Sequence, residues 1–275
     1  MVARQQEAEG GQVPGADREI PLGGLITGAV RVDRTIRRPD GPASAAAADL
    51  LRHLADAGFE GAPRFLGRDE HGRSVVSWIE GWSPDPSQEH LVTAEAVHAT
   101  GALLRRYHRA VAGYRPPVPF PEGPPLPGPG QIVCHGDVAP RNTVFADGLP
   151  VAFVDWDGAW VSQPLWDVGY AVWQFAPLQP DEVLRERGWP GIPDRLERAA
   201  ALADGYQLDR AGRAALPATI APMIEACADS ITAKARAGQP AFVRLAAAGV
   251  LDGMAREARF ASRLESSLRQ RLLRL

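Results

Sequence analysis

The sequence predicts an α+β fold of two lobes, a small antiparallel-β N-terminal lobe followed by a larger, mainly helical C-terminal lobe. Short β-prone runs separated by glycines fill the first part of the chain, and helical periodicity dominates the rest. A length of 275 residues, of which 45% are hydrophobic, suffices for one large domain or two small lobes. We expect a flexible N-terminus over residues 1–18, the N-lobe over 19–80 and the C-lobe over 81–275.

Turn signals and local propensity predict the elements of the N-lobe. Glycines and an aspartate separate the first β-prone runs, which is typical of an antiparallel meander. Strands are expected at 29–32, 35–37, 64–66 and 74–79, with a polar turn at 69–72. A helix is expected over 44–57, because Ser44 is a good N-cap, its leucines share one face and Gly58 is a good helix stop.

Beyond residue 81 the hydrophobic pattern is mainly helical. Apolar residues recur near a 3.6-residue period over 93–112. Eight prolines in the fifteen residues of 116–130 exclude a helix or a central strand and predict a stiff, extended connector. Strand-like runs follow at 131–134, 143–145 and 151–154, and helices follow from Trp166 onward, with breaks at 177–180, 188–193 and 238–240.

The charge and cysteine content exclude several functional classes. The net charge is −3 and the sequence pI is about 6.1, so no basic field favours nucleic acid or an anionic membrane. The two cysteines provide no disulfide framework and no paired zinc spacing. The N-terminus lacks the apolar core of a signal peptide, and no run reaches the roughly 18 apolar residues of a membrane helix. We therefore expect a soluble, cytoplasmic protein without a nucleic-acid or membrane partner.

Polar residues with a defined spacing follow the strand-like runs of the C-lobe. Asp137 comes shortly after the run at 131–134, Asn142 lies five residues later, and Asp155 lies thirteen residues after Asn142. Phosphoryl transfer from a nucleotide needs a carboxylate to orient the attacking hydroxyl and oxygen ligands to hold Mg²⁺ against the phosphates. Mg²⁺ prefers carboxylate and amide oxygens and retains several waters. Two aspartates and an asparagine at strand ends therefore favour a phosphotransferase site.

These segments resemble those of a known family. The His-Gly-Asp run at 135–137, followed by Asn142, resembles the catalytic loop of the aminoglycoside phosphotransferase family, a branch of the protein-kinase-like fold. The Asp-Trp-Asp run at 155–157 is similar to that family's metal-binding element. The resemblance covers most of the chain, because the order of the lobes, the hinge between them and a helix beginning near Trp166 and Asp167 also agree with it.

The resemblance implies a role for each matched residue. Asp137 is the expected catalytic base, and Asn142 and Asp155 are the expected Mg²⁺ ligands. Supporting roles in the site are expected for His135, Arg141 and Asp157. The expected co-substrate is ATP or GTP, and the expected partner is a small-molecule hydroxyl acceptor.

The N-lobe departs from the kinase pattern, which places a lysine on the third strand and a glutamate on the next helix. The chain's only lysine, Lys234, lies far outside the N-lobe. Arg37 is the best candidate to grip the phosphates, with Arg38 next, because arginine offers phosphate a forked cation. An exposed basic strand end is the alternative. On the expected helix, alanines stand where the glutamate would sit, and Asp49 is the only acid before Asp56.

Two further N-lobe features bear on nucleotide binding. The backbone of the hinge is expected to pair with the adenine edge at Trp78, Ile79, Glu80 and Gly81, and a plain strand end is the alternative. A phosphate-covering turn is only weakly indicated by Gly23, Gly24 and Gly28, because they do not spell Gly-x-Gly-x-x-Gly.

Aromatic and acidic side chains are candidates for the acceptor pocket. The aromatic candidates are Trp156, Trp160, Trp166 and Trp173, of which we expect at least two to be core. The acidic candidates, which suit a cationic acceptor such as an aminosugar, are Glu225, Asp229, Asp252 and Glu257. Solvated helix faces are the favoured explanation of these acids. Cys134 is expected to be a core residue, because adjacent strand residues point to opposite faces and His135 could not activate it.

The sequence therefore predicts transfer of the γ-phosphate of ATP or GTP to a hydroxyl of a small molecule, with aminoglycosides and other antibiotics among the candidate acceptors. The alternative is a pseudokinase that has lost catalysis and acts as a nucleotide- or ligand-binding regulatory protein. Retention of Asp137, Asn142 and Asp155 favours the active enzyme. No pattern in the sequence indicates an oligomeric state.

Overall fold

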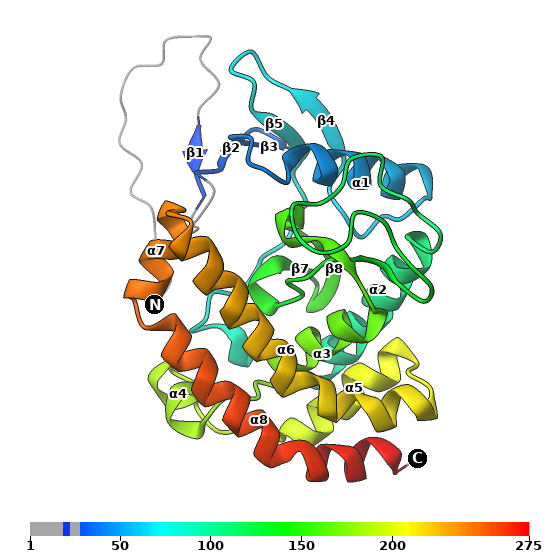
Figure 1. Ribbon diagram of the computed structural model, residues 1–275, viewed down its shortest axis with the longest axis vertical. Coiled ribbons are helices and arrows are strands. Elements are labelled where there is room, and N and C mark those ends of the chain that lie inside the picture. The colour runs from blue at the N-terminus through cyan, green and yellow to red at the C-terminus, as the bar shows by residue number, and fades with distance from the viewer. Residues whose placement is uncertain (1–18, 23–27, 275) are drawn as a thin grey trace.

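The computed structural model describes residues 19–22 and 28–274. The predicted flexible segment 1–18 and the glycines Gly23 and Gly24 lie outside the described residues. The described chain forms a small antiparallel sheet with one helix, set against a larger and mainly helical lobe (Figure 1). The predicted α+β fold of two lobes is therefore confirmed.

A five-stranded antiparallel sheet forms the N-lobe, in the order β1-β2-β3-β5-β4. Its strands are β1 (Ile20–Pro21), β2 (Val30–Val32), β3 (Thr35–Arg38), β4 (Phe65–Arg68) and β5 (Ser74–Ser77). The central strand is β3, on which Ile36 lies opposite Arg31 of β2 and Val76 of β5. Strands β2 to β5 lie where the sequence predicts strands, and β5 ends two residues before the expected residue 79.

One helix, α1 (Ser44–Asp56), accompanies this sheet. Its N-cap is Ala43, so the prediction of Ser44 as the N-cap is wrong by one residue. The chain turns tightly before the helix, and the Ser44 hydroxyl accepts the Gly41 N–H at 2.8 Å instead of capping the helix. The leucines that share the apolar face are buried as expected, namely Leu50, Leu51 and Leu54.

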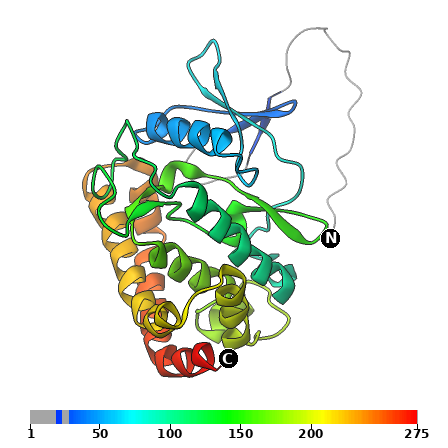
Figure 2. The ribbon, with the colours of Figure 1, turned by 90° about the vertical axis from the view of Figure 1, so that its right-hand side faces the viewer.

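Seven α-helices make up most of the C-lobe within the described residues. They are α2 (Ala94–Ala110), α3 (Pro164–Phe175), α4 (Asp181–Glu186), α5 (Arg195–Tyr206), α6 (Arg210–Arg236), α7 (Pro240–Ala247) and α8 (Val250–Leu273). Helix α2 packs along α5, and α6 packs along α8 (Figures 1 and 2). The predicted helix breaks at 177–180, 188–193 and 238–240 are all present.

Two short two-stranded sheets hold the polar segments of the C-lobe. Strand β6 (Ile132–Cys134) pairs with β9 (Trp160–Ser162), and β7 (Thr143–Ala146) pairs with β8 (Leu149–Phe153). The sequence does not predict β9, because three residues are too few for a period-2 pattern.

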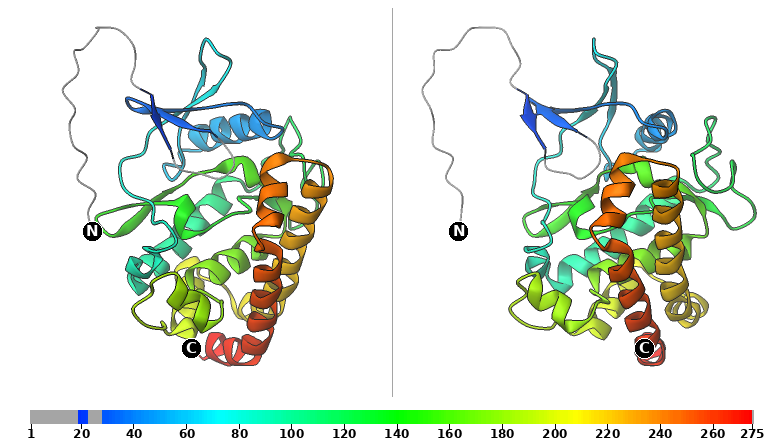
Figure 3. Two further views of the ribbon diagram at one scale, coloured as in Figure 1. Left: turned by 90° about the vertical axis from the view of Figure 1, so that its left-hand side faces the viewer. Right: turned by 60° about the vertical axis from the view of Figure 1, so that its left-hand side comes forward.

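The chain leaves the N-lobe through residues 78–81 and enters the C-lobe at Trp82, whose backbone pairs with that of Phe145 at N···O distances of 3.0 and 2.8 Å. Glycine is required at position 81, because φ is +144° and an added Cβ would meet the Phe145 carbonyl oxygen at 2.4 Å. The proline-rich segment 116–130 has no helix or strand, as predicted. It runs beside the upper end of α6 (Figure 3), where Glu122 accepts the Ser230 hydroxyl at 3.0 Å.

One buried core joins the two lobes. It contains Leu50 and Leu54 from α1 together with Tyr107, Phe153 and Trp156 from the C-lobe. Because Phe153 and Trp156 are anchored in this core, the residues between them are held at the junction of the lobes. Across residues 19–22 and 28–274, no helix combines the length and the apolar character that a membrane crossing needs.

Candidate active site

A loop from the end of β6 carries the first predicted motif. His135 is fully buried, and Gly136 follows it with a φ of +80°. A Cβ added to Gly136 would meet the carbonyl oxygen of Gly158 at 2.2 Å, so only glycine lets the two motifs approach this closely. The loop ends in a 3₁₀ turn (Pro140–Asn142) that leads into β7. Asp137 is thereby held beside the second motif.

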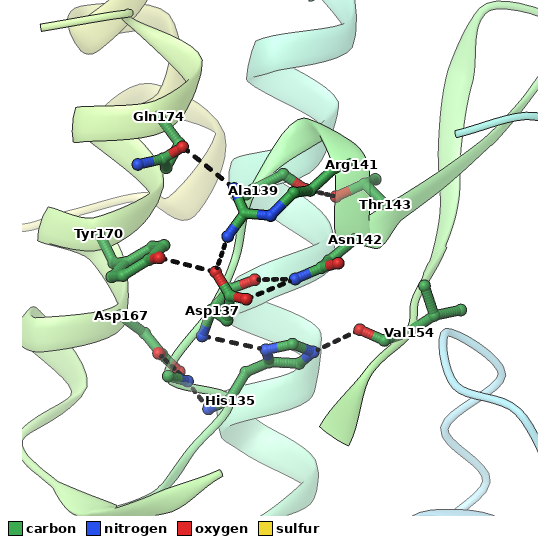
Figure 4. A network of polar contacts seen from close by, with 11 residues as sticks. His135, Asp137, Ala139, Arg141, Asn142, Thr143, Val154, Asp167, Tyr170 and Gln174 are labelled. Carbon is green, nitrogen blue, oxygen red and sulfur yellow. Dashed lines mark hydrogen bonds and ion pairs between the residues drawn. The ribbon is translucent and has the colours of Figure 1, made fainter. Parts of the chain in front are cut away.

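The carboxylate of Asp137 accepts hydrogen bonds on both oxygens (Figure 4). Oδ1 accepts the Tyr170 hydroxyl at 2.7 Å and Nη2 of Arg141 at 2.5 Å. Oδ2 accepts Nδ2 of Asn142 at 2.7 Å. Three donors from two elements restrict the rotation of the side chain, and Asp137 is therefore presented in one orientation.

The ring of His135 joins the two motifs. Its Nδ1 accepts the Asp137 N–H at 3.3 Å, and its Nε2 lies 3.1 Å from the Val154 carbonyl oxygen. A carbonyl oxygen only accepts, so Nε2 carries the proton and the ring is the neutral tautomer. Burial lowers the pKa of His135, and this effect outweighs the nearby aspartates, whose negative charges raise it. A lowered pKa agrees with a neutral ring. His135 therefore ties the loop to the residue before Asp155.

Asp167, fully buried on α3, holds the backbone of the same loop. Its carboxylate accepts the N–H groups of His135 at 2.7 Å and of Gly136 at 2.8 Å, and it lies 3.1 Å from Nε2 of His108. Burial alone would raise the pKa of Asp167, but these hydrogen bonds and the neighbouring histidines hold it below its ordinary value. An acid within an otherwise apolar helix is the signal that marks this residue in the sequence.

Sequence reasoning misses two more residues on α3. Tyr170 donates to Asp137, and Gln174 accepts Nη1 of Arg141 at 3.4 Å. Asp167, Tyr170 and Gln174 are spaced by three and four residues, so they share one face of the helix. That spacing, counted from Asp167, is the signal that could have found them.

The second motif meets the N-lobe through Arg38. Asp155 lies in a left-handed conformation with φ of +65°, between buried Phe153 and Trp156. Nη2 of Arg38 lies 2.5 Å from Oδ1 of Asp157, and Nη1 lies 3.5 Å from Oδ1 of Asp155. Burial raises the pKa of Asp157, and the charge of Arg38 opposes that shift. Strand β3 is therefore joined electrostatically to the motif at 155–157.

Arg38, which the sequence predicts only after Arg37 as the phosphate-binding arginine, is the one that contacts these carboxylates. Arg37 faces the opposite side of β3, because neighbouring strand residues alternate. A role for Arg37 in nucleotide binding stays a prediction. Asp49, the candidate partner on α1, accepts the Tyr114 hydroxyl at 2.5 Å. The Asp49 carboxylate is therefore engaged by Tyr114 of the C-lobe, and a role for Asp49 beside Arg37 stays a prediction.

The amide and carboxylate oxygens of the two motifs are the kinds of ligand that Mg²⁺ takes. Nδ2 of Asn142 donates to Asp137, so the amide oxygen points away from that carboxylate, on the side of Val154 (Figure 4). The Val154 N–H donates to the Asn142 carbonyl oxygen at 2.9 Å, which fixes the segment of Asp155 beside Asn142. Among the described residues, no cluster of three or more His, Cys, Asp or Glu side chains is placed to hold a metal. A site of one amide and one or two carboxylates suits Mg²⁺, which retains several waters.

The predicted hinge agrees only in part with the geometry. The Trp78 N–H donates to the Arg34 carbonyl oxygen at 2.8 Å, so it is already used within the N-lobe. The guanidinium of Arg31 lies 4.0 Å over the Trp78 ring, and Arg34 forms an exposed ion pair with Glu80 at 3.6 Å. Adenine contacts through the Trp78 N–H are therefore not favoured, and contacts through residues 79–81 stay predictions.

The candidate acceptor residues separate into core and surface. Trp156 and Trp173 are buried, which confirms that at least two of the four tryptophans are core. Trp160 and Trp166 are half-buried and meet edge to face at 5.1 Å. Glu257 is buried and accepts Nε1 of Trp173 at 2.8 Å, so the expectation of a solvated face is wrong for it. Exposure agrees with that expectation for Glu225, Asp229 and Asp252.

The two lobes, the loop with Asp137 and the carboxylates at 155–157 define a protein of the protein-kinase-like fold. Residues 121–202 match the profile described as the phosphotransferase enzyme family. The trifolitoxin immunity protein of Rhizobium leguminosarum bv. trifolii is 36% identical over 200 residues, which cover 70% of this chain and 74% of the relative. The chain belongs to the phosphotransferase enzyme family.

Solved structures of low identity share the fold. A choline/ethanolamine kinase family protein from Mesorhizobium loti superposes with a TM-score of 0.62 at 18% identity, covering 93% of this chain and 92% of the other. The gentamicin complex of APH(2″)-IIa gives a TM-score of 0.56 at 11% identity, covering 88% of this chain and 93% of the other. An aminoglycoside phosphotransferase from Alicyclobacillus acidocaldarius gives 0.52 at 15% identity, over 98% of both.

Proposed function

We propose that this chain transfers the γ-phosphate of ATP or GTP to a hydroxyl of a small molecule. The observation that carries the proposal is the Asp137 carboxylate, held by donors from Tyr170, Arg141 and Asn142 beside the motif that contains Asp155. A fixed carboxylate next to oxygen ligands for a metal is the arrangement that phosphoryl transfer needs.

The chain's own residues then have defined tasks. Asp137 orients the acceptor hydroxyl and takes its proton. The acceptor oxygen forms a bond to the γ-phosphorus while the bond from that phosphorus to the β–γ bridging oxygen breaks. Asn142 and Asp155 would hold Mg²⁺, which supplies neutralising charge to the phosphates when bound. Arg38, with its guanidinium at Asp155 and Asp157, is the cation best placed to contact a phosphate.

The acceptor that we propose is a hydroxylated antimicrobial compound, in the cytoplasm where nucleotide is available. Support comes from the relative at 36% identity, which is named as an immunity protein for trifolitoxin. The fold is also shared with APH(2″)-IIa, whose structure holds gentamicin. Aminoglycosides are therefore the first acceptors to test, followed by other antibiotics.

A second candidate function is immunity or regulation by binding, without catalysis. The observation that favours it is the contact of Arg38 with both Asp155 and Asp157, because a guanidinium placed there competes with a metal ion for the same carboxylates.

An ADP-release assay over a panel of hydroxylated antibiotics and metabolites tests the first function. Asp137→Asn keeps the size of the side chain but removes its charge, so we expect turnover of the best acceptor to fall by about 100-fold or more. Asp147→Asn is the matched control, because it makes the same change on an exposed turn where φ is +50° and asparagine is well tolerated. Equal turnover by wild type and Asp137→Asn would exclude the mechanism.

Thermal unfolding with Mg²⁺-ATP and Mg²⁺-GTP separates the two candidates. An active enzyme should be stabilised by nucleotide only when Mg²⁺ is present, and Asp155→Ala should remove that stabilisation. Stabilisation without turnover of any acceptor would support the binding protein.

A further inference from the structure

A hollow lies where the C-terminal half of α2 meets the turn from α5 to α6, two elements that lie side by side in Figure 2. The hollow is shallow and open to solvent, with a volume of about 470 Å³. Its lining consists of Arg105, His108, Arg109, Ala112, Tyr206, Gln207, Leu208 and Asp209. None of the predicted phosphotransferase residues is among them.

The charges in the lining favour an anion. Nη1 of Arg105 is buried without a hydrogen-bond partner among the described residues. Neither Arg105 nor Arg109 forms an ion pair with a carboxylate in the part of the chain that the structure describes, whereas nearby Arg213 pairs with Asp204 at 2.6 Å. An unsatisfied buried guanidinium N–H is costly, so the Arg105 side chain would gain by turning to give this N–H to a ligand in the hollow.

The one acid in the lining does not cancel this preference. Asp209 is the N-cap of α6, where its Oδ1 accepts the Gly212 N–H at 2.7 Å. Its charge is therefore directed at the positive end of the helix, while the two guanidiniums remain available to the hollow. Forked guanidinium groups suit the oxygens of phosphate better than a single point charge does.

A chain of hydrogen bonds runs from two residues of the lining, Tyr206 and His108, to the loop that holds Asp137. The Tyr206 hydroxyl lies 2.8 Å from Nδ1 of His108, whose Nε2 lies 3.1 Å from Asp167. Asp167 in turn accepts the N–H groups of His135 and Gly136. Nε2 of His108 donates to the Asp167 carboxylate, and in a neutral ring Nδ1 is then left to accept the Tyr206 O–H.

We propose that this hollow binds a phosphate group, either free or as the ester of a small molecule, and that its occupancy alters the catalytic loop. Arg105 and Arg109 contact the phosphate oxygens. Tyr206 has one O–H proton and can donate to one acceptor, so a phosphate that takes this donor removes it from His108. Without the hydrogen bond from Tyr206, the His108 ring changes its position relative to Asp167. This in turn changes the hydrogen bonds from the N–H groups of His135 and Gly136 to Asp167. The binding part of this proposal does not depend on the proposed function.

Calorimetric titration with inorganic phosphate at low ionic strength tests the binding. We expect Arg105→Ala/Arg109→Ala to weaken the affinity by about tenfold or more, and Arg109→Ala alone to weaken it less. Arg106→Ala is the matched control, because Arg106 is the exposed neighbour of Arg105 and does not line this hollow. Arg38→Ala identifies phosphate bound at the candidate active site, and it should leave the second site unchanged.

The proposal is overturned if wild type does not bind phosphate, if the double variant binds it as wild type does, or if only Arg38→Ala weakens binding. Glycerol 3-phosphate, titrated in parallel, distinguishes the sources. Tighter binding than inorganic phosphate indicates an ester, and equal or weaker binding indicates free phosphate. Circular dichroism and the melting temperature check that each variant is folded.

Hydrogen exchange of the loop amides tests the coupling. Phosphate should change the protection of the Gly136 N–H in wild type, and Tyr206→Phe should bind phosphate but lose this response. No change in wild type, or the same change in Tyr206→Phe, contradicts the link to the loop.

Discussion

The hydroxyl of Tyr170, on α3, donates to Oδ1 of Asp137, in the loop that follows β6, at 2.7 Å. Burial raises the pKa of Tyr170, and the charge of Asp137 adds to the shift, so the phenol keeps its proton and remains a donor. Asp167, three residues earlier on the same helix, holds the backbone of that loop. One helix therefore positions both the loop and the carboxylate that it presents.

Replacing Tyr170 by Phe should lower turnover more than it lowers stability. The ring remains, but Asp137 loses one of its donors and is held less firmly. We expect kcat to fall by roughly tenfold with KM little changed, and the free energy of unfolding to fall by about 1 kcal/mol. Tyr114→Phe is the control, since it removes a hydroxyl that donates to Asp49 at 2.5 Å. A similar loss of kcat in both variants would argue against a positioning role for Tyr170.

Arg38 should contribute more to nucleotide affinity than Arg37. Arg38→Ala removes the cation at Asp155 and Asp157, and we expect the affinity for Mg²⁺-nucleotide to fall by about tenfold. Arg37→Ala should have a smaller effect, because Arg37 faces the other side of β3. Equilibrium binding of a fluorescent nucleotide measures both. If Arg37→Ala lowers the affinity more than Arg38→Ala does, Arg37 is the main phosphate-binding arginine, as the sequence predicts.

Gly136→Ala should destabilise the protein strongly. Both a left-handed φ and the carbonyl oxygen of Gly158 oppose a Cβ at this position. Gly188→Ala is the matched control, with a φ of +81° and open space around the added Cβ. Chemical denaturation should show a loss of about 1–2 kcal/mol for the control and a further 1–3 kcal/mol or so for Gly136→Ala. If both variants lose the same free energy of unfolding, the close approach of Gly136 to the Gly158 carbonyl oxygen does not restrict residue 136.

Stability should fall in mild acid because of His135. Its pKa is lowered in the folded state, so the unfolded chain, with a histidine pKa of about 6.5, takes up a proton first. The free energy of unfolding therefore decreases as the pH falls below about 6.5, until the pH reaches the lower folded pKa. His135→Gln should remove this part of the pH dependence.

His71→Gln is the control for that measurement, since His71 is exposed on the turn between β4 and β5. Denaturant titrations between pH 5 and 8 compare wild type with both variants. If wild type and His135→Gln have the same slope with pH, the buried neutral histidine is not the cause.

Several features of this chain could be predicted because they depend on neighbours in the sequence. The separation of Asp137 from Asn142, the helix of 44–57, the proline-rich connector and the order of the lobes follow from local spacing, periodicity and turn chemistry. The predicted cap of α1 failed by one residue, because Ser44 is used by the turn that precedes the helix. Local sequence signals predict the presence of a helix or strand more accurately than they predict the residue at which it begins or ends.

The sequence by itself determined the class of fold and the residues of both motifs, since the loop and the strands that hold them are contiguous. Only the tertiary structure decided which arginine meets Asp157, because that depends on the register of β3 and on how the lobes meet. It also decided that Tyr170 reaches Asp137 and that Asp49 is taken by Tyr114. The first contact joins residues 33 positions apart and the second joins residues 65 positions apart. Such contacts depend on how the elements pack, and no local sequence pattern indicates them.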